Sequence, residues 1–177
     1  TRPGVLLLDE PLSALDPFLR IRMREELKRL HTELGITFVH VTHSQTEAMA
    51  LADLVVVMNQ GRIEQAGPPR EVFNLPRTAF VARFIGGHNV VEDAAGRRAV
   101  RADRILLGRP EGADHQVEGT VRALEYHGAS VHLTLDVPGA EDFAVVLDES
   151  RFYDAPLAIG DRVTAGWRAR DVHPLVA

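Results

Sequence analysis

The stretch Val5-Leu6-Leu7-Leu8-Asp9-Glu10-Pro11 determines the fold class that this sequence predicts. Its apolar run over 5–8 has no polar face, which is typical of a strand buried on both sides in a parallel sheet. Asp9 and Glu10 follow at the strand end, where open α/β sheets place their ligands. There one carboxylate can help to hold Mg²⁺ on a nucleotide, while its neighbour orients or deprotonates an attacking water. The alternative is an acidic pair that merely ends the strand at a turn.

A second buried strand is predicted over 36–42, because this run is rich in β-branched residues. It ends at His43, in the same topological place as Glu10. Residues 44–47 fit a capping box, so we expect a helix to begin directly after the histidine. A neutral imidazole placed there can accept a hydrogen bond from water while it donates one to a phosphate oxygen. The alternatives are a plain loop histidine or a metal pair with His40, and strand residues three apart point to opposite faces, which argues against the pair.

The segment between these strands is predicted to be a helix. Asp16-Pro17 starts it, with the acid as N-cap and the proline in the first helical position. Apolar residues recur at three- and four-residue spacing over 15–34 and form one stripe, and Gly35 marks the end. Lys28, the only lysine of the chain, lies inside this helix. A P-loop requires Gly-Lys-Ser or Gly-Lys-Thr, so the chain has no P-loop.

Composition excludes several classes of protein. The 177 residues can hold one ordinary domain or two small ones, and the net charge of −5 disfavours a nucleic-acid partner. Without cysteine, neither a disulfide nor a thiolate metal site can form. No apolar run approaches the length of a membrane span, and no secretory signal opens the chain. We therefore expect a cytoplasmic polypeptide with no direct membrane span.

The middle of the chain continues the α/β pattern up to Gly86-Gly87, which we interpret as a hinge. We expect a third buried strand over 54–58, a hairpin turn over 59–62 and a short antiparallel strand over 62–66. A short helix over 70–74 and a second apolar-faced segment over 79–85 should follow.

From about Val90 the hydrophobic pattern changes to a period of two. Apolar residues at 131, 133, 135 and 137 alternate with polar ones, which predicts a half-buried strand. Further strands are expected around 117–123, 143–147 and 162–170, with turns between them. Several short strands in so small a segment favour a closed or nearly closed barrel. The predicted fold class is therefore α/β followed by all-β.

The string Leu-Leu-Leu-Asp-Glu-Pro-Leu-Ser-Ala-Leu-Asp over 6–16 resembles the Walker B and D-loop segment of ATP-binding cassette (ABC) transporter ATPases. The resemblance continues through 39–48, 53–58 and 61–67. It implies the C-terminal part of a P-loop-type nucleotide-binding domain, with parallel strands and helices. It also implies Mg²⁺ coordination by Asp9, water polarisation by Glu10 and γ-phosphate contact by His43. Ser13 and Asp16 would meet a second ATPase subunit across a nucleotide sandwich.

The segment that follows resembles the TOBE domain, an OB-like accessory module of importer ATPases. Residues 99–105 look like a variant of that module's Val-Arg-Pro-Glu motif, in which Ala102 and Asp103 replace Pro-Glu. This departure puts any role tied to the motif in doubt. The resemblance divides the chain into an ATPase part over 1–87 and a TOBE-like barrel over 88–177.

Neither a Walker A segment nor the signature stretch of the family is present, so we interpret the chain as the C-terminal portion of a longer ATPase. The parent protein would use ATP and Mg²⁺, whereas this chain alone is expected to bind neither tightly and to be inactive. The implied partners are a second ATPase subunit in a homodimer, membrane permease subunits and, indirectly, a solute-binding protein. The segment over 61–91 most resembles the polyamine-type branch, followed by ferric-iron and sulfate importers. The expected location is the inner face of the cell membrane, through the permease.

Two other interpretations remain. In the first, the chain is a non-catalytic regulatory or assembly module whose barrel binds a small ligand or a partner subunit. In the second, it is a truncated product whose incomplete sheet seeks a partner. Loss of the P-loop strand should expose the flanks of the strands at 5–8 and 37–41, so dimerisation, strand exchange or aggregation is expected.

Overall fold

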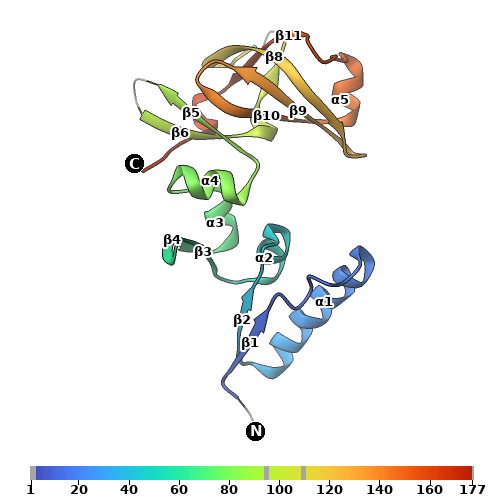
Figure 1. The fold of residues 1–177 in the computed structure, drawn as a ribbon, viewed down its shortest axis with the longest axis vertical. Coiled ribbons are helices and arrows are strands. Elements are labelled where there is room, and N and C mark those ends of the chain that lie inside the picture. Colours follow the sequence, from blue (N-terminus) through green and yellow to red (C-terminus); the bar gives the residue numbers. More distant parts are fainter. Residues whose placement is uncertain (1–2, 94–95, 109–110, 177) are drawn as a thin grey trace. The chain divides into compact units, whose positions relative to one another are not determined.

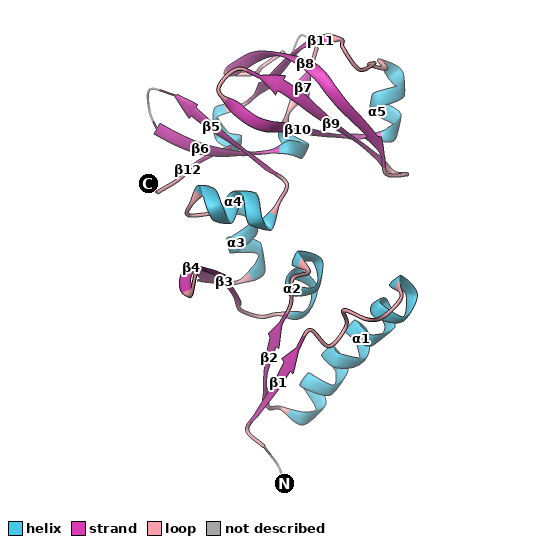
Figure 2. Ribbon diagram, viewed as in Figure 1, coloured by secondary structure: helices cyan, strands magenta, loops and turns pink. Residues whose placement is uncertain are grey.

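The computed structural model describes residues 3–93, 96–108 and 111–176, with Asp93 described by its backbone alone (Figures 1 and 2). The chain forms two compact units, one of Thr1–Val57 with Ala66–Val72 and the other of Met58–Gln65 with Phe73–Ala177. The division predicted after residue 87 remains a prediction, and each unit is described here by itself.

The first unit is built on two parallel strands, β1 (Val5–Asp9) and β2 (Thr37–Val41). Their register pairs Val5 with Thr37 and Asp9 with Val41. Helix α1 (Pro17–Leu34) connects them and lies alongside both strands (Figure 1). Because the strands run in the same direction, the residues that follow each of them meet at one edge of the sheet.

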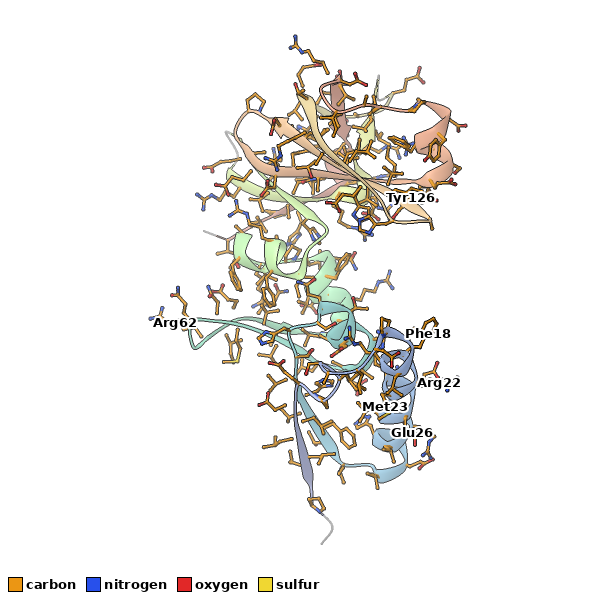
Figure 3. All side chains as sticks on the ribbon, turned by 45° about the vertical axis from the view of Figure 1, so that its right-hand side comes forward. Phe18, Arg22, Met23, Glu26, Arg62 and Tyr126 are labelled. Atoms are coloured by element: carbon orange, nitrogen blue, oxygen red, sulfur yellow. The ribbon has the colours of Figure 1, made fainter. Side chains whose placement is uncertain are left out.

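Helix α1 begins and ends where its sequence predicts. The Asp16 carboxylate accepts hydrogen bonds from the backbone N–H groups of Phe18 and Leu19, both at 3.0 Å. Gly35 adopts φ 60 at the other end, where its N–H donates to the His31 carbonyl at 3.1 Å. None of the described residues of α1 is buried, and Phe18 is 83% exposed. Figure 3 shows Phe18, Arg22, Met23 and Glu26 along this helix.

The prediction that the first two strands are buried on both faces is wrong for this unit. Val5 and Leu7 of β1 are 51% and 73% exposed, and Val39 and Val41 of β2 are 43% and 53% exposed. The alternate residues of each strand are half-buried. Among the described residues this sheet has two strands, and no element covers its second face. The apolar side chains on that face are therefore exposed to water.

Strand β3 (Val55–Asn59) and strand β4 (Arg62–Gly67) form a hairpin. Its turn residues Gln60 and Gly61 have φ 48 and 76, the conformation that two-residue hairpin loops favour. Val55 and Val57 are buried, whereas Val56 is 45% exposed, so this strand is half-buried and not buried on both faces as predicted. Helix α2 (Gln45–Leu51) precedes this hairpin in the chain, and two further short helices, α3 (Pro69–Asn74) and α4 (Ala79–Ile85), follow it.

The second unit contains two antiparallel sheets that curl around one hydrophobic core. The five-stranded sheet has the order β10-β9-β8-β11-β7, and the three-stranded sheet has the order β12-β6-β5. The elements after α4 are β5 (His88–Asp93), β6 (Gly96–Arg101), the 3₁₀ turn η1 (Ala102–Arg104), β7 (Leu106–Leu107), β8 (His115–Tyr126), β9 (Ser130–Val137), β10 (Ala140–Asp148), α5 (Glu149–Asp154), β11 (Arg162–Trp167), η2 (Ala169–Asp171) and β12 (Val172–Pro174). Strand β9 alternates buried apolar residues with half-buried or exposed polar ones, as predicted.

A buried asparagine joins the two sheets of this unit. Asn89 on β5 is 2% exposed, and its side-chain Nδ2 donates to the carbonyl of Ala144 on β10 at 2.7 Å. Its Oδ1 accepts from the N–H of Ala144 at 2.6 Å. The side-chain amide therefore takes the place of a backbone pair where the sheets meet. The predicted fold class, an α/β part followed by an OB-like barrel, is confirmed.

Candidate functional site

The predicted carboxylate and histidine meet at the carboxyl edge of the parallel sheet. Glu10 directly follows β1, and its N–H donates to the carbonyl of Val41 on β2 at 2.9 Å. His43 follows β2 by two residues. Its Nε2 lies 2.9 Å from Glu10 Oε1, with the histidine side chain 85% and the glutamate side chain 40% exposed. The pair is therefore both formed and accessible to a ligand from solvent.

The backbone of Glu10 is in an unusual conformation for a residue with a side chain. Its φ is 44, in the left-handed region that glycine normally occupies. Ser13 holds this turn, because both its N–H, at 3.2 Å, and its hydroxyl, at 2.9 Å, donate to the Glu10 carbonyl. Backbone conformations of this kind concentrate at functional sites, where the surrounding structure enforces them.

The other predicted site residues lie close by in the chain. Asp9 is the last residue of β1 and is exposed, so its carboxylate is accessible at the same edge. Ser13 and Asp16 each have a role inside this chain, Ser13 on the Glu10 turn and Asp16 as the cap of α1. The functional roles predicted for all five residues remain proposals.

Sequence reasoning missed a buried carboxylate behind this edge. Glu47 on α2 is 4% exposed and accepts a hydrogen bond from the Thr42 hydroxyl at 2.8 Å. Arg20 Nε and His40 Nε2 lie 3.8 and 3.9 Å from its two oxygens. His40 therefore faces Glu47 while His43 faces Glu10, which places the two imidazoles in different surroundings. The capping-box pattern was the available signal, but it indicated a helix start and not a buried charge.

In the second unit, Asp103 forms an ion pair with Arg101. Arg101 Nε and Nη2 donate to the two Asp103 oxygens at 2.9 and 2.7 Å. Its Nη1 donates to Asn74 at 2.7 Å, and its guanidinium lies 5.1 Å from the Phe73 ring centre. Burial opposes ionisation of Asp103, but the hydrogen bonds and charge of Arg101 outweigh it and lower the pKa of this carboxyl. The variant motif therefore fixes β6 against the residues that end α3.

An open depression of about 620 Å³ lies at the turn between β9 and β10. Its lining mixes charged and apolar residues, and Arg122 is already paired there with Asp136, at 3.4 Å, and with Asp142. Within the described residues, no group of three or more His, Asp or Glu side chains could hold a metal ion. The described helices include none that is both long and apolar enough to cross a membrane.

Comparisons with known proteins relate both units to one family. The TOBE domain family matches residues 98–175. An uncharacterized ABC transporter ATP-binding protein, YdcT of Escherichia coli K12, is 41% identical over 184 residues, which cover 98% of this chain and 54% of that protein. The spermidine/putrescine import ATP-binding protein PotA of Thermobifida fusca is 38% identical over 199 residues, 94% of this chain and 52% of that protein.

Among solved structures, cbiO1 of Clostridium perfringens, part of the ABC transporter complex cbiONQ, is 41% identical with a TM-score of 0.38. The match covers 40% of this chain and 28% of that one. The chain spans about half the length of the curated relatives that it matches.

Proposed function

Because this chain belongs to the TOBE-containing ATP-binding proteins of ABC transporters, we propose that it is the C-terminal portion of an ATP-hydrolysing importer subunit. The observation that carries the proposal is the contact between Glu10 and His43 at the edge where β1 and β2 end, 2.9 Å between Oε1 and Nε2. The contact depends on the register of the parallel strands β1 and β2, which both belong to the first unit.

The residues at this edge fit the chemistry of ATP hydrolysis. Asp9 offers exposed carboxylate oxygens, the donor type that Mg²⁺ prefers. When bound, Mg²⁺ would neutralise charge on the phosphate oxygens. Glu10 would accept a proton from, or orient, the attacking water, and His43 would donate to the terminal phosphate. Ser13 and Asp16 would contact a second ATPase subunit.

We further infer that this chain alone neither binds ATP usefully nor hydrolyses it. Backbone amides of a P-loop and its lysine supply most phosphate binding, and the only lysine here, Lys28, is exposed on α1. The uncovered apolar face of the β1–β2 sheet supports the inference that, in the longer protein, an upstream segment packs on this face.

The partners of the longer protein follow from the same family. We infer a homodimer of ATPase subunits on membrane permease subunits, served indirectly by a solute-binding protein, at the cytoplasmic face of the cell membrane. Polyamines are the proposed solute class, which the names of PotA relatives support.

Substitution of Glu10 in the full-length protein tests this function. Glu10→Gln keeps the side-chain shape and the backbone turn but removes the carboxylate, so ATP turnover should fall by roughly 10²-fold or more while ATP still binds. Glu25→Gln, on the exposed surface of α1, is the matched control and should keep wild-type turnover. Wild-type turnover by the Glu10→Gln protein would contradict the proposal.

A regulatory role of the barrel is the second candidate, supported by the open depression lined by Arg122, Asp136 and Asp142. Under this proposal a small polar ligand or a partner subunit would compete for the paired charges there. Arg122→Ala should then abolish a ligand-dependent change in the intrinsic fluorescence of Trp167. A ligand response that persists in this variant would exclude the depression as its site.

A further inference from the structure

The buried carboxylate of Glu47 connects two loops that carry candidate site residues. It is 4% exposed and lies among Thr42, at 2.8 Å, Arg20, at 3.8 Å, and His40, at 3.9 Å. These neighbours come from α1, from β2 and from the residue after β2. A buried carboxylate is tolerated only where donors and positive charges surround it, so this group needs its neighbours.

On one side, the contact reaches the loop that holds Ser13 and Asp16. Arg20 Nη2 donates to the carbonyl of Leu15 at 2.9 Å, while its Nε faces Glu47. Leu15 lies between the two predicted residues. The guanidinium therefore lies between the loop backbone, to which it is hydrogen-bonded, and the buried carboxylate, which it faces at ion-pair distance.

On the other side, the contact reaches the residues on both sides of His43. The Thr42 hydroxyl donates to Glu47 and accepts from the Ser44 N–H at 2.9 Å. The Ser44 hydroxyl accepts from the Glu47 N–H at 3.3 Å. In an ordinary capping box the glutamate would accept from the Ser44 N–H directly. Here Thr42 stands between them, so the hydrogen bonds fix the backbone on both sides of His43.

The contacts of Arg20 Nε and His40 Nε2 with Glu47 are longer than hydrogen bonds, and both atoms are buried. A movement of about 1 Å would convert either contact into a hydrogen bond.

We propose that Arg20, Thr42 and Glu47 form a positioning network that sets the geometry of His43 relative to the Ser13–Asp16 loop. The inference rests on the proposed function, because it concerns the same site. The proposed role of the three residues is to position the site and not to contact the nucleotide. They act through the backbone at Leu15 and Ser44, and a misplacement of about 1 Å at a reacting group can cost about 10²-fold in rate.

The matched pair Thr42→Val and Thr42→Ser in the full-length protein tests the proposal. Valine has nearly the shape of threonine but cannot relay the hydrogen bonds, whereas serine can. Thr42→Val should lower kcat about tenfold or more, with KM for ATP within about twofold of wild type. Its melting temperature should fall by a few degrees, because the buried Glu47 carboxylate loses a hydrogen-bond donor. Thr42→Ser should keep at least about half of wild-type kcat.

A double-mutant cycle with Arg20→Lys and Glu47→Gln provides the second measurement. Arg20→Lys keeps the charge but cannot donate to Leu15 and face Glu47 at once, so its effect on kcat should be strongly non-additive with that of Glu47→Gln. Additive effects, a Thr42→Val protein with wild-type kcat, or a Thr42→Val protein that loses ATP affinity as strongly as it loses kcat would each overturn the proposal.

The Glu10→Gln protein is measured alongside and separates the two possible failures. If Glu10→Gln loses turnover and Thr42→Val does not, the positioning network is wrong and the proposed function stands. If Glu10→Gln keeps turnover, the proposed function itself is wrong, and the network loses its role with it.

Discussion

At the scale of single residues, Asn89 and Glu10 each combine an unusual conformation or burial with specific hydrogen-bond partners. The amide of Asn89 is buried and satisfies both backbone groups of Ala144 across the seam of the barrel. Glu10 combines a left-handed backbone with a side chain in contact with His43. Asn89 connects the two sheets of the barrel, and Glu10 belongs to the candidate site. In each case the neighbouring residues determine the conformation.

Replacement of Asn89 by alanine should destabilise the second unit by about 2–4 kcal/mol, because a buried N–H and a buried carbonyl would each lose their partner. Urea unfolding measures the loss, and hydrogen exchange at the Ala144 amide locates it. Gln116→Ala removes a similar amide from the exposed side of β8 and should change stability by less than about 0.5 kcal/mol. Equal stability of the two variants would show that the seam does not depend on Asn89.

The sequence could predict some of these residues and not others. The placement of Asp9, Glu10 and His43 at or just after strand ends could be predicted, because each belongs to a string that resembles a known motif, while their roles remain proposals. Asn89, Arg20 and Glu47 could not be predicted, because their importance depends on which distant groups the fold brings to them. A polar residue that ends up buried has no periodicity to mark it.

At the scale of elements, strands β5, β9 and β12 each carry a histidine whose pKa is lowered. Burial is the largest cause for His88, His132 and His173. For His88 the hydrogen bond between Nδ1 and the Gly86 carbonyl, 3.0 Å long, opposes the shift, and the charge of Arg101 adds to it. The folded barrel therefore favours the neutral form of all three rings.

The barrel should lose stability as the pH falls below the ordinary histidine pKa of about 6.5. Because the folded pKa values lie below that value, the unfolded chain takes up protons first, so their contribution is complete above pH 6.5 and declines toward lower pH. Urea unfolding between pH 7.5 and pH 5 measures the slope. His88→Gln should make the slope shallower, and a slope that is identical in this variant would refute the role of His88.

Helices and turns were easier to predict than strand burial. The Asp16 cap and the left-handed Gly35 are local features, so α1 begins and ends as expected. Whether β1 is covered depends on other layers of the sheet, which a local run of leucines cannot reveal. For the same reason, the apolar run of β3 predicts a strand buried on both faces, whereas every second residue of β3 is exposed or half-buried.

At the scale of the whole molecule, the β1–β2 sheet exposes apolar side chains, whereas the barrel encloses a hydrophobic core. The first unit presents the Glu10–His43 pair but lacks a phosphate cradle within the sequence given. An account of the chain as part of an ABC transporter ATPase explains both features, because an upstream segment would supply the cradle and cover the apolar face.

Calorimetric titration with MgATP tests this account most directly, on the chain itself and on the protein extended upstream through a Walker A segment. The account predicts no measurable binding by the chain and micromolar binding by the extended protein. Micromolar binding by the chain alone, or no binding by the extended protein, would contradict it.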